Sequence, residues 1–198
     1  MALLLASCSA QHKRKQLFFT VRGSNTYEYA GKEYSRYELM DELQKIRAWP
    51  GPPTDIVLIA PGNTPYSWVH PLQVLTSMRG YSEYRLTTNA IEPGQFFFGG
   101  SVGDSSTIWK STEVNLEKGE FYLYIDEGRV ARLDDPKAFW ADTNYAHMAY
   151  IVASPTTTAQ RLVHELDTLN SCKVLPYVVD FNIFSGDAVV EDYDESEL

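Results

Sequence analysis

The amino-acid sequence predicts an α+β protein made of two tandem modules, and three observations support this fold class. Residues 61–77 and 155–171 are identical at seven of seventeen positions when they are aligned at an offset of 94. An apolar run precedes each segment and another follows it, as expected for two copies of a strand–turn–helix–strand unit. A stretch rich in glycine and serine separates the copies. Two copies are too few for a solenoid, so we expect two small domains in tandem.

Each module is predicted to have the order β-β-α-β-α-β and to form a small open sheet with its helices on one face. The boundaries that we expect are a leader at 1–15, a first module at 16–90, a linker at 91–117, a second module at 118–182 and an acidic tail at 183–198.

In the first module, residues 16–21 and 26–30 read as two strands of a hairpin, because they are rich in aromatic and β-branched residues and enclose turn residues. Ser35 is the expected N-cap of a helix over 36–47, which shows apolar residues at helical spacing. A proline-rich segment at 49–53 ends that helix.

The repeated part of the first module begins with a buried strand at 55–60, which is a continuous apolar run. Thr64 is the expected N-cap of the next helix, with Pro65 at its first position. Pro71 predicts a kink or a later start, and a strand over 82–88 closes the module.

The second module is expected to begin with a strand at 120–125. Asp135 and Pro136 predict the start of a short helix that ends at Trp140. The repeated strand, helix and strand then follow between residues 148 and 180.

Composition narrows the possible functions. The chain is 44% hydrophobic and 22% charged, which is ordinary for a folded protein and excludes disorder throughout. Its net charge is −9, and five of the acidic residues lie in the tail at 191–197. Nucleic-acid binding is not expected, because the basic surface that it requires has no counterpart in this sequence.

The N-terminal segment predicts a lipid anchor. Residues 5–8, Leu-Ala-Ser-Cys, resemble the bacterial lipobox, in which small residues precede a cysteine that is acylated and becomes the new N-terminus. The apolar run before Cys8 is shorter than an export signal requires, so an upstream start codon is one interpretation and a chance apolar start is the other. With Cys8 acylated, Cys172 becomes a lone thiol, which we expect to be buried and structural. The sequence contains no uninterrupted stretch of about 18 apolar residues, so we expect no transmembrane helix.

No catalytic or metal-binding motif stands out. His70 and His164 occupy equivalent positions of the repeat, and we interpret both as half-buried packing residues. The pair His164-Glu165 begins like a zinc-protease motif, but Thr168 stands where the second histidine is required. We therefore expect no enzymatic activity, no metal and no cofactor.

The first module resembles the periplasmic domain of ExbD/TolR-type biopolymer-transport proteins. The resemblance is carried by residues 29–43, a strand followed by Gly-Lys and a leucine-rich helix, and by residues 55–75, a buried strand followed by Thr-Pro-Tyr and a second helix. It covers about residues 17–88, and 119–180 more faintly. Family members have an N-terminal transmembrane helix with a proton-coupling aspartate, and this sequence lacks such a segment, so that role is not carried over.

The resemblance implies a non-enzymatic protein in the bacterial cell envelope, located in the periplasm or lipid-anchored on the periplasmic face of the inner or outer membrane. Its expected partner is an envelope protein or peptide strand, or the cell wall, and the two modules are expected to form a pseudo-dimer within the chain. Tyr66, Trp68 and Trp140 are the candidate binding residues, with an aromatic core as the alternative interpretation. Two other functions stay open: a small hydrolase-type enzyme with a pocket lined by residues 96–98, Tyr66 and Trp68, and a purely structural lipoprotein.

Overall fold

The computed structural model confirms the α+β fold class and describes residues 15–47, 54–78, 83–88, 96–97, 109–126, 129–179 and 189–191. The first unit contains β1 (Lys15–Gly23), β2 (Thr26–Tyr29), β3 (Lys32–Ser35), α1 (Arg36–Arg47), β4 (Thr54–Ile59), α2 (Tyr66–Met78) and β5 (Glu83–Thr87). The second unit contains β7 (Trp109–Asn115), β8 (Glu120–Asp126), β9 (Arg129–Arg132), α3 (Pro136–Trp140), β10 (Ala146–Val152), α4 (Ala159–Ser171) and β11 (Leu175–Val179).

The two units have the same topology. The strand order is β5-β4-β1-β2-β3 in the first unit and β11-β10-β7-β8-β9 in the second. In each unit, three neighbouring strands are parallel and the two outer strands at the far end pair antiparallel. The order differs from the prediction, because each unit has three strands rather than two before its first helix.

Two short strands complete the sheet. The two-residue strand β6 (Phe96–Phe97) pairs with both β5 and β11, so the units join in one twelve-stranded order. At one end, β12 (Val189–Glu191) pairs with β9, so part of the predicted tail at 183–198 is a strand. The predicted linker at 91–117 likewise contains β6 and all of β7, and the second unit begins at Trp109 rather than at 118.

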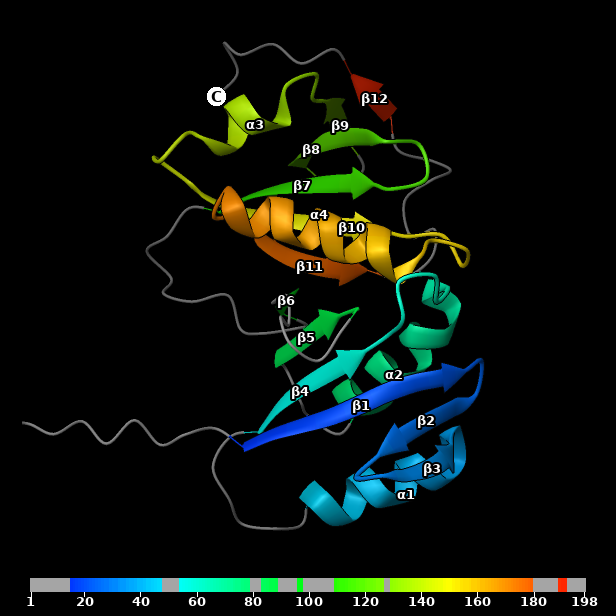
Figure 1. Ribbon diagram of the computed structural model, residues 1–198. Coiled ribbons are helices and arrows are strands. Elements are labelled where there is room, and N and C mark those ends of the chain that lie inside the picture. Colours follow the sequence, from blue (N-terminus) through cyan, green and yellow to red (C-terminus); the bar gives the residue numbers. More distant parts are fainter. Residues whose placement is uncertain are drawn as a thin grey trace, which may run out of the picture.

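The central helices of the two units cover opposite faces of the sheet. Figure 1 shows α4 in front of β10 and β11, whereas α2 lies behind β1 and β4. The strand order runs outward from β6 as β5-β4-β1-β2-β3 on one side and as β11-β10-β7-β8-β9 on the other. In Figure 1 the arrows of β1, β4, β7 and β11 point the same way. The units are thus related by an approximate twofold axis that runs along the strands.

One hydrophobic core runs through both units. Its buried side chains in the first unit include Leu17, Phe19, Leu39, Leu43, Leu58, Leu72 and Leu75, and those in the second include Val114, Ile151, Leu162, Leu166 and Leu169. The burial of apolar side chains is the main stabilising contribution to a fold. No helix of the described residues is long and apolar enough to span a membrane.

Two of the strands that the prediction missed, β3 and β7, were missed for identifiable physical reasons. Strand β3 has only four residues, of which Lys32 and Glu33 are exposed, and it is specified by a turn in which Ala30 and Gly31 have φ of 52° and 77°. Two consecutive positive φ angles are typical of the tight turns that join hairpin strands. Strand β7 reads as polar in sequence, but it lies in the sheet between β8 and β10, where pairing on both sides determines its structure.

The helix ends agree closely with the sequence. Ser35 caps α1 in a capping box: its backbone N–H donates to the Glu38 carboxylate at 2.8 Å, and its Oγ accepts from the Glu38 N–H at 3.4 Å. Asp135 caps α3, accepting from the Ala138 N–H at 3.0 Å, so the predicted helix 136–140 is confirmed. The prediction for α2 was one residue early, since this helix begins at Tyr66 and runs through Pro71.

Candidate functional site

Two of the three predicted binding residues lie in the core. The Tyr66 side chain is fully buried, and Trp140 keeps only 4% of its surface exposed. The Trp140 indole N–H donates to Thr112 Oγ1 at 3.3 Å, and its ring packs edge-on against Phe121. Both residues therefore have the alternative role, that of aromatic core, because their rings fill space under α2 and α3 and present no surface to a partner.

The other two predicted site residues have different positions. Trp68 is half-buried on α2, packs against the core, and its carbonyl accepts a hydrogen bond from the Tyr27 hydroxyl at 3.2 Å. Cys8 lies outside the described residues, and its lipidation stays a prediction. Cys172 is a free, half-buried thiol at the C-cap of α4 and packs against the core.

The two equivalent histidines do not share a site. His70 lies against the Tyr66 ring, with the ring centroids 5.6 Å apart, and His164 is exposed on α4. His70 is on α2 and His164 is on α4, and these two helices cover opposite faces of the sheet in Figure 1. In the described part of the chain, no three His, Cys, Asp or Glu side chains are arranged to hold a metal ion.

The repeated loops that gave the strongest sequence signal bind each other. The N–H groups of Tyr66 and Ser67, at the start of α2, donate to the carbonyls of Thr157 and Pro155 at 2.7 and 3.1 Å. In return, the N–H of Ala159, at the start of α4, donates to the Thr64 carbonyl at 2.8 Å.

This seam between the loops has the same approximate twofold symmetry as the units. The offset of 94 makes Thr64 equivalent to Thr158, and Pro65 to Ala159. The structure pairs Pro65 with Thr158 in an antiparallel bridge, and bonds Ala159 to Thr64, which is the symmetric pairing. The first N–H groups of a helix have no partner within the helix and often bind anions. In this seam the opposite loop satisfies them, so the repeated motif holds the two units together.

A different surface carries the polar and aromatic side chains that suit a binding site. Glu113, on β7, lies directly opposite Tyr122 of β8 and directly opposite Tyr150 of β10. Residues opposite each other in a sheet share one face. The neighbouring residues Val114 and Ile151 face the core under α4, so Glu113 and both tyrosines face the other way. We call Glu113, Tyr122, Tyr124 and Tyr150 the tyrosine face.

Contacts within the tyrosine face centre on the glutamate. The Tyr124 hydroxyl donates to Glu113 Oε2 at 2.8 Å, and the Tyr124 and Tyr150 rings meet edge-to-face with centroids 5.8 Å apart. Burial, followed by the hydrogen bond to Glu113, raises the pKa of Tyr124, so this phenol keeps its proton and stays a donor. Glu113 is 7% exposed, whereas the three tyrosines are partly exposed.

A second carboxylate borders the tyrosine face. The Tyr122 hydroxyl donates to Glu120 Oε2 at 2.5 Å, and this bond, followed by burial, raises the pKa of Tyr122 to about 12. Glu120 also lies 3.8 Å from the Arg132 guanidinium, which is at the same distance from Asp134. Glu120 therefore has a cation beside it. For Glu113, in contrast, no ion pair is formed with any side chain of the described residues.

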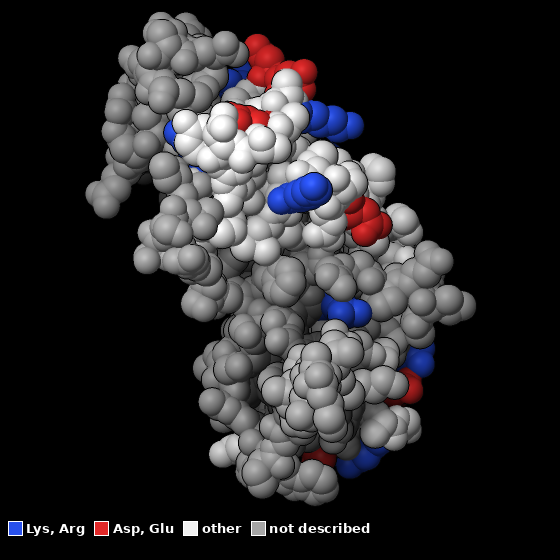
Figure 2. All heavy atoms as spheres, turned by 90° about the vertical axis from the view of Figure 1, so that its left-hand side faces the viewer, with Lys and Arg blue, Asp and Glu red and all other residues white. Residues whose placement is uncertain are grey.

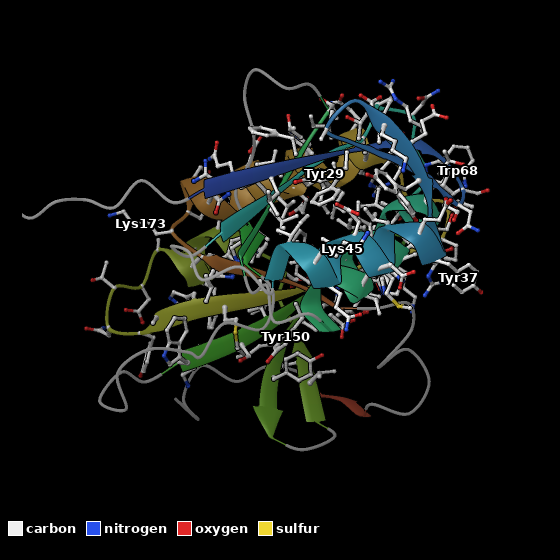
Figure 3. All side chains as sticks on the ribbon, turned by 90° about the horizontal axis from the view of Figure 1, so that it is seen from below. Tyr29, Tyr37, Lys45, Trp68, Tyr150 and Lys173 are labelled. Carbon is white, nitrogen blue, oxygen red and sulfur yellow. The ribbon has the colours of Figure 1, made fainter. Side chains whose placement is uncertain are left out.

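The predicted and observed surfaces are separate. Figure 3 shows Tyr150 on the second unit, well away from Trp68 and Tyr37, which point outward from the first. On the face seen in Figure 2, the described lysine and arginine side chains stand apart from one another and form no continuous basic patch.

Sequence reasoning did not find the tyrosine face, although one signal was available. Residues 120, 122 and 124 are Glu, Tyr and Tyr, and they alternate with the apolar residues at 121, 123 and 125. This alternation predicts a strand with one polar, aromatic face. Glu113 could not be added to that face, because its strand was predicted to be linker.

Comparison of the chain with models of protein families, with curated proteins and with solved structures finds no match.

Proposed function

We propose that this chain is a non-enzymatic binding protein of the bacterial cell envelope, and that it binds a polypeptide partner through the tyrosine face. The observation that supports this proposal most directly is the cross-strand row Tyr122, Glu113 and Tyr150 on the sheet face opposite to α4. Tyrosine is enriched in protein interfaces because its ring offers a large rigid contact and its hydroxyl a hydrogen bond.

The seam and the single core provide a rigid scaffold for the tyrosine face. Binding costs less when the surface is preorganised, because fewer side chains and loops are ordered on association. The three tyrosines stand on paired strands, and one of them is fixed by its bond to Glu113. The envelope location rests on the lipobox-like sequence before Cys8 and on the resemblance to ExbD/TolR-type domains.

Site-specific cross-linking tests the binding surface. A photoreactive phenylalanine analogue replaces Tyr122 in the full chain, and this variant is expressed in the native cells. Its cross-linked products are compared with those of a second variant that has the same analogue in place of Tyr37. Tyr37 is the matched control, because it is an exposed tyrosine on α1 of the first unit. We expect a discrete polypeptide adduct from position 122 that position 37 does not give.

The same cells test the location. Mass spectrometry of the N-terminus is expected to show an acylated Cys8 in the membrane fraction. Equal adducts from the two positions, or none from position 122, would contradict the binding surface. An unmodified N-terminus in the cytoplasmic fraction would contradict the envelope location and leave the binding surface as a separate result.

A further inference from the structure

We propose that the tyrosine face binds a cationic side chain, a lysine or arginine, of the polypeptide partner. This inference rests on the proposed function and specifies the chemistry of the group that is recognised. It is carried by one juxtaposition: a buried carboxylate that has no cationic partner among the described side chains and that has three tyrosines as neighbours.

The first step is the charge balance at Glu113. Glu113 is buried, and its carboxylate accepts a hydrogen bond from the Tyr124 hydroxyl. Buried carboxylates in proteins are normally paired with a cation or neutralised, because desolvation penalises an isolated charge. No described lysine, arginine or histidine supplies that cation. Within the described part of the chain, the carboxylate of Glu113 therefore has no positive charge paired with it.

The second step is the aromatic surround. Tyr122 and Tyr150 flank Glu113 in direct register on the two neighbouring strands. The negatively charged face of an aromatic ring attracts ammonium and guanidinium groups, with a larger effect where water is excluded. Two partly exposed rings beside a carboxylate provide both interactions that a cationic side chain uses.

The third step identifies the source of the cation as a polypeptide. The chain carries a net charge of −9, which attracts basic partners over a distance set by the salt concentration. The carboxylate is nearly covered, so a cation must arrive on a long, flexible stem that passes the tyrosine rings. Lysine and arginine have such stems, whose methylenes pack on apolar surface while the charged end reaches a polar partner.

The experiment titrates the full chain with tetralysine and, separately, with tetra-acetyl-lysine, a peptide of four lysines that are each acetylated on the side-chain nitrogen. The second peptide has the same length but no side-chain charge. Backbone amide shifts in NMR spectra report both affinity and location. We expect tetralysine to shift the amides of β7, β8 and β10, and tetra-acetyl-lysine to have little effect. Glu113→Gln should weaken tetralysine binding by about tenfold, because it removes the buried charge and keeps an acceptor for Tyr124.

The matched control is Glu117→Gln. Glu117 is exposed in the turn that follows β7, so its substitution changes the net charge equally without altering the tyrosine face. It should change the affinity by less than about twofold at physiological salt, because exposed charges are screened. Tyr122→Leu removes one of the two rings beside Glu113 and should weaken tetralysine binding.

Several results would overturn the inference: an equal loss in Glu113→Gln and Glu117→Gln, equal binding of the acetylated peptide, or amide shifts confined to the first unit. The experiments distinguish a failure of the cation inference from a failure of the proposed function. A discrete adduct at position 122 together with no effect of Glu113→Gln keeps the binding surface and rejects the cation. Absence of both rejects the proposed function itself.

Discussion

The first and second units share a topology but differ in what their outer faces present. In the first unit, the sheet face away from α2 has Phe18 opposite Val57, and neither side chain carries a charge. In the second unit, the sheet face away from α4 has Glu113 opposite Tyr150. The inner faces stay alike, since Leu72 and Leu75 of α2 have Leu166 and Leu169 of α4 as their equivalents.

This difference separates the residues that hold the fold from those of the proposed binding surface. The paired core leucines of the two helices are kept in both copies, because close packing tolerates few changes of volume. On the outer face the residue types differ between the copies, with Val57 next to Phe18 in one and Glu113 next to Tyr150 in the other. The loops that bind each other in the seam lie at the start of the repeated segments 61–77 and 155–171.

The largest expected effect tests whether the two units fold as one. Leu72→Ala and Leu166→Ala remove equivalent, fully buried side chains, and each should lower the free energy of unfolding by about 2–5 kcal/mol. Because one core and one sheet span both units, each variant should still show a single transition. Denaturant unfolding followed by circular dichroism measures this. Two transitions, with only one of them shifted in each variant, would show that the units are independent.

A smaller effect compares the helix caps of the two units. Ser35 and Glu38 cap α1 with reciprocal bonds, whereas Thr158 makes one bond of 3.4 Å to the Arg161 N–H at the start of α4. Ser35→Ala should therefore cost about 1 kcal/mol, and Thr158→Ala about 0.5 kcal/mol. Urea unfolding of both variants checks the order, and a larger loss for Thr158→Ala would indicate that the Thr158 hydroxyl also supports the seam.

The smallest effect compares the pH dependence of two glutamates. Hydrogen bonds from the Ser35 N–H and hydroxyl lower the pKa of Glu38, so its stabilising contribution exists above the unfolded pKa and is lost as pH falls through the folded pKa. Burial raises the pKa of Glu165, so its contribution exists at low pH and is lost as pH rises through the folded pKa.

Thermal unfolding of Glu38→Gln and Glu165→Gln at about pH 3 and about pH 7 tests these signs. Glu38→Gln should be destabilising at the higher pH and nearly neutral at the lower. The melting temperature of Glu165→Gln, relative to that of the parent protein, should be higher at the higher pH than at the lower. The same sign for both variants would contradict the assigned causes, burial at Glu165 and capping at Glu38.

Local patterns in the sequence determined much of this structure. The α+β class, the duplication, the helix at 36–47 with its Ser35 cap and the helix at 136–140 were all predictable, because each depends on residues within a few positions of one another. The apolar runs at 55–60 and 148–153 likewise predicted buried strands, since burial on both faces needs continuous apolar residues.

Only the tertiary structure decided what the local patterns leave open. Strand β7 is polar in sequence and owes its structure to pairing with β8 and β10. Tyr66 and Trp140 look alike in sequence to exposed aromatic residues, and packing under α2 and α3 buries them. The tyrosine face joins residues of three strands that are up to 37 positions apart, 113 to 150. Register between distant strands is set by long-range pairing and burial, which no short window of sequence contains.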